Sequence, residues 1–466
     1  MAKLTFYGGT GTVTGANFLL EIDGPAGSIK VLVDCGLIQG QKFGENLNRS
    51  EFCYNPADID YLLVTHAHLD HIGRIPKLVK EGFKGQILST PETKEITEFL
   101  LQDTVKILET EARHEGVLPL YEAADIAPTL NLWSTVLYHT NFALKGGINL
   151  YFKDAGHVLG STIIELSRPD PEKKNQIKKI AFTGDLGNSP SLLLRDTEWV
   201  TDADYILMES VYGDRNHEPK IERHRKLKKV IEEVIKHKRT LIIPAFSLER
   251  SQMIIYELNE LFENGEINGP IPVFLDSPLA IKITGVYAKY TEDFNDKVRA
   301  DIQSGDDIFS FPRLRYIVQG GESQMISKVP NPKIIIAGSG MSVGGRVILH
   351  EKHYVSNPNV EILFVGYQAT GSLGRQLQDG AKHVNIFGED KEVRAKIESI
   401  SGYSSHKDSD HLLEFIEKAT EEEKLKKVFV VMGEPKSSMF LVQKLRDNLG
   451  VDAIYPKFKQ TIEIEF

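Results

Sequence analysis

The chain has 466 residues, of which 41% are hydrophobic and 26% charged, and its formal net charge is −10 at pH 7. This length predicts two or three domains, and no apolar run approaches the ~18 residues that a membrane span needs. The negative charge argues against a broad nucleic-acid-binding face, but it says little about a recessed site that holds cations. The start of the chain does not resemble a signal peptide, and Cys35 and Cys53 cannot form a disulfide framework. We therefore expect a cytoplasmic protein that does not bind membranes.

The first informative elements are two apolar segments. KVLVDCGL, at residues 30–37, predicts a strand that ends in Asp34, with a glycine close behind. YLLV, at residues 61–64, predicts a second buried strand, and the helical spacing of apolar residues in IGRIPKLVKEG predicts a helix after it. Between this strand and this helix lies THAHLDH, which places three histidines and one aspartate in seven residues.

THAHLDH has the spacing of a metal site. His66 and His68 are two residues apart, so their side chains point the same way in extended backbone. Asp70 and His71 fall in the following turn, where the backbone can aim them at a neighbouring point. Imidazole and carboxylate groups are common zinc ligands, so one turn could serve two adjacent ions. The alternative is a surface loop with incidental histidines, which is less favoured because the chain has only 14 histidines.

Two later segments carry further candidate ligands at strand ends. Residues 148–167 predict two strands around a glycine-rich turn that contains His157, and residues 179–189 predict an apolar strand that ends near Asp185. Glycines beside both residues allow the close backbone approach that a crowded metal site demands. Each aspartate alone fits an ordinary turn, but together with THAHLDH these residues indicate a dinuclear metal site.

In this order and context, the residues resemble the motif series of the metallo-β-lactamase superfamily. The resemblance implies an αββα sandwich with two zinc ions at one edge of two packed sheets. The implied ligands are His66, His68 and His157 for one zinc ion, Asp70 and His71 for the other, and Asp185 as a bridge. Asp34 would orient ligands without binding metal. Flavodiiron relatives carry a glutamate at the position of His68, so the histidine favours zinc over iron.

The second half of the chain has its own α/β pattern. TLIIPAF, IPVFLDSPLA, KIIIAGSGMSVGG and EILFVGY predict strands, and the stretches between them have helix-like composition. Strands that alternate with helices predict a mostly parallel sheet. Residues 221–239 are the clearest helix, and we interpret its basic residues as a solvated face rather than an RNA clamp.

Four features of this half resemble the β-CASP insertion, which marks nucleic-acid-processing members of the superfamily. They are Glu209 in ESVYGDR, the stretch PAFSLERSQ at residues 244–252, His383 in GAKHV, and His406 in GYSSHKDSD. The resemblance implies that His406 completes the second zinc site. It also implies that residues 1–208 and 384–466 form the metallo-β-lactamase sandwich and that residues 209–383 form an inserted α/β β-CASP domain. KVFVVMGEPKSS and QTIEIEF would then finish the second sheet of the sandwich.

Two positions depart from the family pattern. Met432 stands where many relatives have a histidine before Gly-Glu, so the role of this position is open, and it is not among the implied ligands. Ser405 replaces the usual alanine before His406 and leaves the histidine itself intact.

The resemblance implies hydrolysis of a phosphodiester by a two-metal mechanism, with Asp70 among the catalytic residues. Two cations roughly 3.5–4 Å apart lower the pKa of a shared water and stabilise charge in the transition state. His383 is the candidate general acid because imidazole titrates near the working pH. Glu209 would orient His383 and keep it protonated. The alternative for His383 is a structural role.

The sequence also offers candidate phosphate-binding residues. AGSGMSVGGR, at residues 337–346, follows a strand and is expected to open a helix, so backbone N–H groups around Ser339 and Gly340 could hold a phosphate. The same spacing also fits a simple tight crossover. Ser247, Arg250 and Arg375 are further candidates.

The leading interpretation is a zinc-dependent ribonuclease that cleaves single-stranded RNA internally, from the 5′ end, or both, and that could act as a homodimer. A DNA nuclease of the same fold is the first alternative, but such members typically have valine in the motif that contains His406. A non-catalytic scaffold would have lost metal ligands, whereas every ligand position here is filled. A small-molecule ester or thioester hydrolase would leave the inserted domain unexplained.

Overall fold

The computed structural model describes residues 1–24, 27–39, 44–170, 173, 176–369 and 371–466. The chain divides into two compact units. Unit 1 contains Met1–Asn216 and Ser405–Phe466, and unit 2 contains His217–Ser404. Unit 2 is therefore an insertion in unit 1, as the sequence predicts.

Unit 1 contains two seven-stranded sheets. The first has the order β22 (Thr461–Ile464), β1 (Ala2–Phe6), β2 (Phe18–Gly24), β3 (Gly27–Val33), β4 (Tyr61–Leu63), β5 (Gln86–Ser89) and β6 (Trp133–Thr135). The second has the order β21 (Ala453–Ile454), β20 (Lys427–Val430), β11 (Tyr205–Met208), β10 (Ile177–Phe182), β9 (Thr162–Pro169), β8 (Asn149–Asp154) and β7 (Phe142–Ala143).

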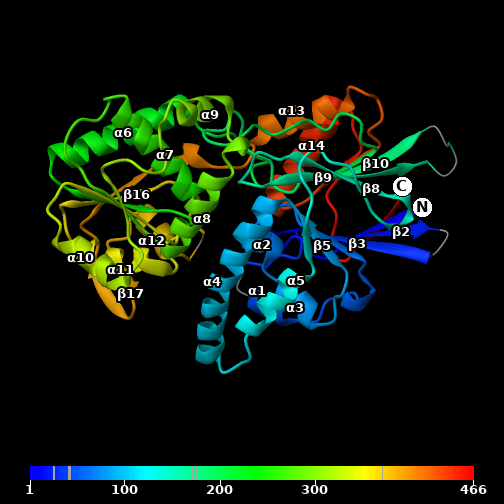
Figure 1. Cartoon of the computed structure of the whole chain (residues 1–466), viewed down its shortest axis with the longest axis horizontal. Coiled ribbons are helices and arrows are strands. Elements are labelled where there is room, and N and C mark those ends of the chain that lie inside the picture. Colours follow the sequence, from blue (N-terminus) through cyan, green and yellow to red (C-terminus); the bar gives the residue numbers. More distant parts are fainter. Residues whose placement is uncertain (25–26, 40–43, 171–172, 174–175, 370) are drawn as a thin grey trace. The chain divides into compact units, whose positions relative to one another are not determined.

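Helices cover the outer faces of both sheets. Beside the first sheet lie α1 (Gly44–Arg49), α2 (Leu69–Ile72), α3 (Ile75–Lys80), α4 (Pro91–Glu115) and α5 (Ile126–Asn131), and beside the second lie α13 (Ser409–Thr420) and α14 (Pro435–Leu449). Figure 1 shows the resulting order of helix layer, sheet, sheet and helix layer. The predicted αββα architecture is confirmed.

The two sheets pack through alternate side chains of their strands. In β8, Leu150 and Phe152 are buried, whereas Tyr151 and Lys153 are only partly covered. Leu150 and Phe152 join Phe6 and other side chains of both sheets in one apolar core. Burying each large apolar side chain contributes roughly 1.5–3 kcal/mol, so this core holds the two sheets together and fixes the edge at which their loops meet.

The two C-terminal strand segments join different sheets. β20 lies in the second sheet beside β11, as predicted from KVFVVMGEPKSS. The prediction that QTIEIEF also finishes the second sheet is wrong, because β22 pairs antiparallel with β1 in the first sheet, with Ala2 opposite Ile464. An alternating strand of this kind can pair with any open sheet edge, so its pattern does not choose between the two sheets.

Unit 2 is built around a six-stranded sheet in which every pairing is parallel, as predicted. Its order is β14 (Leu314–Tyr316), β13 (Val273–Asp276), β15 (Lys333–Ala337), β12 (Thr240–Pro244), β16 (Val360–Phe364) and β19 (Lys396–Ser399). Its helices are α6 (Lys220–Lys236), α7 (Arg250–Glu263), α8 (Pro278–Lys289), α9 (Asp296–Gln303), α10 (Gly320–Met325), α11 (Gly345–Tyr354) and α12 (Leu373–Gln378). β17 (His383–Ile386) and β18 (Glu389–Glu392) form a separate hairpin.

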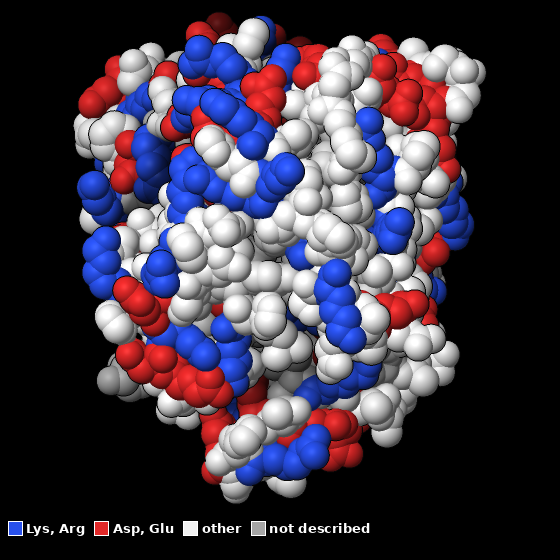
Figure 2. All heavy atoms as spheres, turned by 90° about the vertical axis from the view of Figure 1, so that its left-hand side faces the viewer, with Lys and Arg blue, Asp and Glu red and all other residues white. Residues whose placement is uncertain are grey.

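The basic helix α6 carries paired charges. Arg225 contacts Glu222 in the same helix, and Lys226 and Lys228 contact Glu218 and Glu266. Figure 2 shows Lys and Arg interspersed with Asp and Glu on the face of unit 2 that includes α6. These contacts fit the interpretation of α6 as a solvated face.

The boundaries of the insertion differ from those expected at residues 209 and 384. Residues 384–404 belong to unit 2 because β19 pairs in register with β16, for example Ile397 with Ile362. Residues 209–216 belong to unit 1, where Tyr212 forms a bridge with Asp408.

The chain passes from unit 2 back to unit 1 at Ser404. In unit 2, the hydroxyl of buried Tyr403 donates to Glu257 Oε2 at 2.6 Å. In unit 1, the carbonyl of Ser405 accepts from the backbone N–H of Asn188 at 2.9 Å. Only Ser404 lies between these two anchored residues.

Among the described residues, no helix has both the length and the apolar character needed to span a bilayer.

Candidate metal centre

The candidate ligands gather at one edge of the sandwich because they follow neighbouring strands. Asp34 follows β3, the THAHLDH segment follows β4, Asp185 and Glu209 follow β10 and β11, and His157 lies in the turn between β8 and β9. β3 and β4 are parallel, as are β10 and β11, so their carboxyl ends meet at the same edge. His406 reaches this edge from the segment before α13, where it forms a bridge with Gly187.

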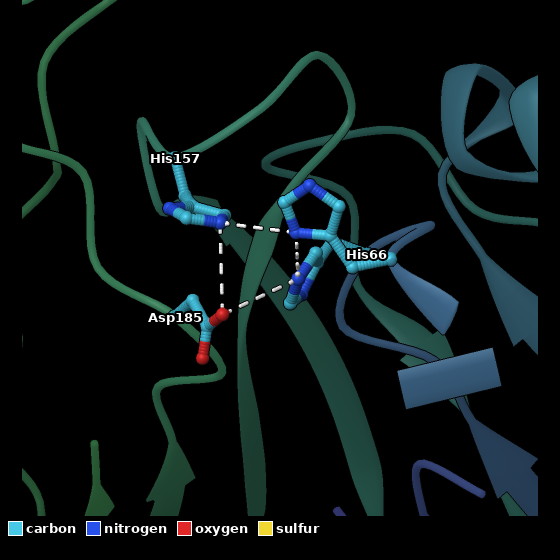
Figure 3. A group of neighbouring side chains, drawn as sticks. His66, His157 and Asp185 are labelled. Carbon is cyan, nitrogen blue, oxygen red and sulfur yellow. Dashed lines mark hydrogen bonds and ion pairs between the residues drawn. The ribbon is translucent and has the colours of Figure 1, made fainter. Parts of the chain in front are cut away.

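Three imidazoles and one carboxylate converge in a cluster that we call site A, defined as His66, His68, His157 and Asp185. His68 Nδ1 lies 3.1 Å from His66 Nε2 and 3.3 Å from His157 Nε2. Asp185 Oδ2 lies 3.5 Å from His66 Nε2 and 3.6 Å from His157 Nε2. Figure 3 shows His66, His157 and Asp185 facing one another. A zinc tetrahedron with bonds of about 2.0 Å has edges of about 3.3 Å, so these four atoms fit that geometry.

The protonation states in site A also suit a cation. His157 Nδ1 donates to the carbonyl of Ser405, which leaves the Nε2 lone pair directed into the cluster. Burial and the neighbouring His406 lower the pKa of His157, and burial and the neighbouring His71 lower the pKa of His66, so both rings are neutral near pH 7. Neutral imidazole is the form that binds a metal.

A second cluster, which we call site B, contains Asp70, His71 and the other oxygen of Asp185. His71 Nε2 lies 3.5 Å from Asp185 Oδ1 and 3.8 Å from Asp70 Oδ2. Both His71 Nε2 and Asp185 Oδ1 are buried, and neither makes a hydrogen bond within the described part of the chain. A cation between them would satisfy both atoms, and Asp185 would then face site A with Oδ2 and site B with Oδ1.

The carboxylates around site B favour positive charge there. Burial lowers the pKa of His71, but the nearby carboxylates of Asp185, Asp34 and Asp70 outweigh burial and raise it well above its usual range. A metal ion that binds His71 Nε2 would therefore compete with a proton for this nitrogen.

Asp34 lies behind site B rather than in it. One carboxylate oxygen, Oδ2, accepts from His71 Nδ1 at 2.7 Å and from the Thr65 hydroxyl at 2.8 Å, and the other accepts from the Thr65 backbone N–H. The bond to Nδ1 leaves the Nε2 lone pair of His71 for site B. Asp34 is thus placed to orient a ligand without itself approaching the ion.

Glu209 contacts His406, a pairing that the sequence interpretation does not include. The carboxylate of Glu209 is buried, and its two oxygens lie 3.1 Å and 3.2 Å from His406 Nδ1. One of these oxygens also accepts from the backbone N–H of Leu186 at 2.7 Å. Burial lowers the pKa of His406, but Glu209 outweighs this effect and the pKa rises to about 9. The same nitrogen, His406 Nδ1, lies 3.9 Å from Asp185 Oδ2. One ring nitrogen of His406 therefore faces both Glu209 and Asp185.

His383, the expected partner of Glu209, lies in unit 2 on the hairpin strand β17. Its side chain is 60% exposed, and its Nδ1 lies 2.9 Å from Asp390 Oδ2 on the adjacent strand. The expected orientation of His383 by Glu209 stays a prediction, because the two residues belong to different units.

The predicted phosphate-binding residues lie mainly at the carboxyl edge of the unit 2 sheet. Ser247 follows β12, and Ser339 and Gly340 follow β15. A third loop contributes Ser277, which sequence reasoning missed. The hydroxyl of Ser277 lies 3.3 Å from the hydroxyl of Ser247. Both hydroxyls are so close to Gly338 that a Cβ atom added to this glycine would contact them. The signal for Ser277 was present in LDSP, since a serine before proline at a helix start is a typical N-cap, and Ser277 caps α8.

The two predicted arginines differ in exposure. Arg250 is nearly buried at the start of α7, after the Ser247 loop. Arg375 lies on α12, and its exposed guanidinium contacts both carboxylate oxygens of Asp379. Arg375 therefore contacts a neighbouring acid one helical turn away.

Comparison with known proteins identifies three family models along the chain. The metallo-beta-lactamase superfamily model matches residues 19–141, the Beta-Casp domain model matches residues 251–377, and the model of the Zn-dependent metallo-hydrolase RNA specificity domain matches residues 390–456.

Curated relatives match nearly the full chain. Ribonuclease TTHA0252 of Thermus thermophilus is 33% identical over 415 residues, which cover 89% of this chain and 90% of the relative. Transcription termination factor FttA of Thermococcus kodakarensis is 30% identical over 480 residues, which cover 99% of this chain and 71% of the relative.

A crystal structure of a protein of unknown function from Enterococcus faecalis V583 shares the fold. It superposes with a TM-score of 0.56 at 13% identity and covers 99% of each chain. The family models, the two relatives and the His/Asp cluster show that the chain belongs to the β-CASP family of the metallo-β-lactamase superfamily and is a metal-dependent hydrolase of the nuclease type.

Proposed function

We propose that this protein is a zinc-dependent ribonuclease that hydrolyses single-stranded RNA with two metal ions. The observation that carries the proposal is Asp185, whose two oxygens face two separate sets of donor atoms, in sites A and B. Paired sites of this kind are typical of enzymes that hydrolyse phosphate esters. The choice of RNA is supported by the relative named as a ribonuclease and by the match to an RNA specificity domain.

The protein residues have separate roles in this proposal. When bound, the two ions supply an activated water and stabilise charge in the transition state. His66, His68 and His157 hold site A, Asp70 and His71 hold site B, and Asp185 joins them. His406, the further ligand expected for site B, lies beside Asp185 with its Nδ1 in contact with Glu209. Asp34 fixes the orientation of His71 through its hydrogen bond to Nδ1.

The departing sugar oxygen requires a proton, and the contacts favour His406 over His383 as its source. Glu209 keeps His406 protonated at neutral pH and holds its ring at the edge of the cluster, with 23% of the side chain exposed. A protonated, partly accessible imidazole beside the metal sites suits general acid catalysis. His383 contacts an exposed aspartate and remains the second candidate. In this assignment Glu209 orients the acid, although its partner is His406.

The carboxyl edge of the unit 2 sheet is the proposed binding site for the phosphates of RNA. Hydroxyls of Ser247 and Ser277 and the loop of Ser339 and Gly340 meet there, at the end of a parallel sheet where α/β folds commonly bind ligands. Arg250 lies close along the chain and would supply positive charge. Arg375 has the weakest support because it is paired with Asp379.

The test is cleavage of matched single-stranded RNA and DNA, labelled at the 5′ or the 3′ end, with added zinc and with chelator. We expect zinc-dependent cleavage of RNA, and the label pattern will separate internal cleavage from 5′-exonucleolytic cleavage. Preferential cleavage of DNA would support the DNA nuclease alternative, and cleavage that persists in chelator would contradict the proposal. Sedimentation of the zinc-loaded protein tests the expected homodimer.

A further inference from the structure

Two large aromatic rings lie exposed at the carboxyl edge of the unit 2 sheet. Phe246 follows β12, and Tyr367 follows β16, the strand that pairs with β12. Their exposed fractions are 37% and 54%. Single exposed rings are common on protein surfaces, so the groups around these two rings decide whether they have a function.

The backbone of Phe246 is held on both sides. The N–H of Ala245 donates to the carbonyl of Ala337 at 3.0 Å, which continues the pairing of β12 with β15. The carbonyl of Phe246 accepts from the backbone N–H of Ser251 at 3.2 Å and from its hydroxyl at 2.7 Å. The ring therefore leaves the sheet edge from a hydrogen-bonded position.

One edge of the Phe246 ring rests on two glycines. A Cβ on Gly340 would lie 2.7 Å from Cδ2 of the ring and 2.9 Å from Cε2, and a Cβ on Gly366 would lie 3.8 Å from Cε2. Gln368 is 1% exposed and ties these glycines together. Its side-chain amide donates to the carbonyl of Gly340 at 2.9 Å and to that of Gly366 at 3.2 Å. This packing fixes one edge of the ring and leaves its exposed part open to a ligand.

The ring and the hydroxyls of the proposed phosphate site meet on one loop. Gly338 lies against the hydroxyls of Ser247 and Ser277. Two residues later, Gly340 lies against the ring of Phe246. Phe246 also directly precedes Ser247, and adjacent Cα atoms are about 3.8 Å apart. A phosphate at the hydroxyls and a base at the ring would therefore belong to the same nucleotide or to neighbouring nucleotides.

A nucleobase suits these surroundings better than an apolar partner does. A nucleotide combines a flat π-face with a phosphate, which matches an aromatic ring beside hydroxyls. Aromatic side chains that stack on bases are a common means of holding single-stranded RNA. A wholly apolar partner would bury the hydroxyls of Ser247 and Ser277 away from water, which costs free energy.

We infer, on the basis of the proposed ribonuclease function, that Phe246 and Tyr367 form a stacking platform for unpaired bases of the RNA, with Phe246 as the main contact. The platform selects single strands, because a base inside a duplex is paired and stacked on its own neighbours. It accepts any base, since every base has a π-face. Gln368 acts as a positioning residue that holds the two glycines under the Phe246 ring.

The experiment measures the affinity of the full chain for short fluorescent single-stranded RNAs in chelator, which prevents cleavage. One RNA has all its bases, and the others carry a single abasic ribose at successive positions. For the native protein, the abasic ribose at the stacked position should lower the affinity roughly 5–100-fold. Phe246→Leu should lower the affinity for the intact RNA by most of this factor, and the abasic ribose at that position should then have no further effect. Phe246→Tyr, which keeps the ring, should bind as the native protein does.

Phe458→Leu is the matched control, because it removes a ring that is 51% exposed from the segment before β22 in unit 1. It should leave the affinity unchanged. If Phe246→Leu lowers the affinity for intact and abasic RNAs by the same factor, the ring only supports the loop and the inference is overturned. An unchanged affinity for the intact RNA overturns it as well. If circular dichroism shows that Phe246→Leu does not fold, Tyr367→Leu takes its place in the abasic scan, with the same two outcomes.

Cleavage of RNA in added zinc is measured in parallel and separates the inference from the proposed function. Zinc-dependent cleavage by the native protein, without coupling between the ring and one base, would overturn the inference alone. Coupling without cleavage would overturn the proposed function alone. Absence of both binding and cleavage would overturn both.

Discussion

The metal edge of unit 1 and the carboxyl edge of the unit 2 sheet are built from different chemical groups. The first uses largely buried histidines and aspartates, some of which are held by a further carboxylate, such as Asp34 behind His71 and Glu209 behind His406. The second uses hydroxyls and loop backbone, where Ser247 and Ser277 contact each other. Removing a member of the first set leaves buried groups without partners, whereas removing a hydroxyl leaves its neighbours intact. The two edges should therefore differ sharply in their sensitivity to substitution.

The largest effect is expected for Asp185→Ala. Because Asp185 contributes one oxygen to each site, the variant should hold less zinc in both sites, and its activity should fall by roughly 10³-fold or more. Elemental analysis and RNA cleavage measure the two losses. Asp202→Ala is the matched control, since Asp202 is an ion-paired carboxylate outside the clusters. Retention of one full zinc equivalent by Asp185→Ala would show that the two sites do not share it.

The next effect separates the two candidate acids. His406→Ala should lower the rate on RNA by roughly 10²–10⁴-fold, because the leaving oxygen loses its proton donor. A nitrophenyl phosphodiester has a good leaving group and should recover much of this loss. His383→Ala is the matched control and should lose less on RNA. If instead His383→Ala shows the larger loss and the recovery, the acid is His383.

A smaller effect is expected at the unit 2 edge. Ser247→Ala removes one hydrogen-bond donor from the proposed phosphate site, at a cost of about 1 kcal/mol, and should raise KM about fivefold with little change in kcat. Ser327→Ala, which changes a serine whose hydroxyl bonds locally to Gln324, is the control. An unchanged KM would remove Ser247 from the binding site, and an equal fall in kcat would place it near the chemistry.

The smallest effect concerns stability. Burial raises the pKa of Glu351 to about 8, and the hydroxyl of Ser342 opposes this only in part. A folded pKa above the ordinary value means that the contribution of Glu351 to stability is complete below about pH 4.5 and is lost as pH rises through 8. Glu351→Gln stays neutral, so its Tm should fall less than the native Tm between pH 6 and 9. Each kcal/mol corresponds to roughly 2–4 °C.

Thermal unfolding at both pH values checks this prediction, with Glu263→Gln at an exposed position of the same unit as the control. Parallel Tm curves for the native protein and Glu351→Gln would show that the buried carboxyl does not ionise in this range.

The same contrast explains which parts of the structure could be predicted from the sequence. THAHLDH, His157 and Asp185 are rare, chemically specific residues at strand ends, so their convergence at one edge follows from the strand pattern and the family motifs. The parallel sheet of unit 2 follows from the alternation of strands and helices. Ser277 is a common residue in an ordinary helix cap, and its proximity to Ser247 depends on which strands are neighbours in the sheet.

The features that the sequence could not show also have a physical origin. Glu209 meets His406 because β11 lies between β10 and β20 and because the segment before α13 forms a bridge with Gly187, and neither fact is encoded locally. The strand KIES at residues 396–399 belongs to unit 2 through its pairing with β16, and QTIEIEF belongs to the first sheet through its pairing with β1. Strand pairing over long sequence separations is set by the whole fold rather than by residue pattern.

The pairing of β1 with β22 has a consequence for synthesis of the protein on the ribosome. Thr5 and Thr461 lie side by side in this pairing although 456 residues separate them in the chain. All of unit 2 is translated before β20, β21 and β22, so it can fold while the sandwich still lacks strands in both sheets. We expect pulsed hydrogen exchange on nascent chains to protect unit 2 before β1, and protection of β1 first would contradict this order. Because His406 also follows unit 2 in the chain, the nuclease centre can be assembled only after the inserted unit has been made, which delays the appearance of activity until late in translation.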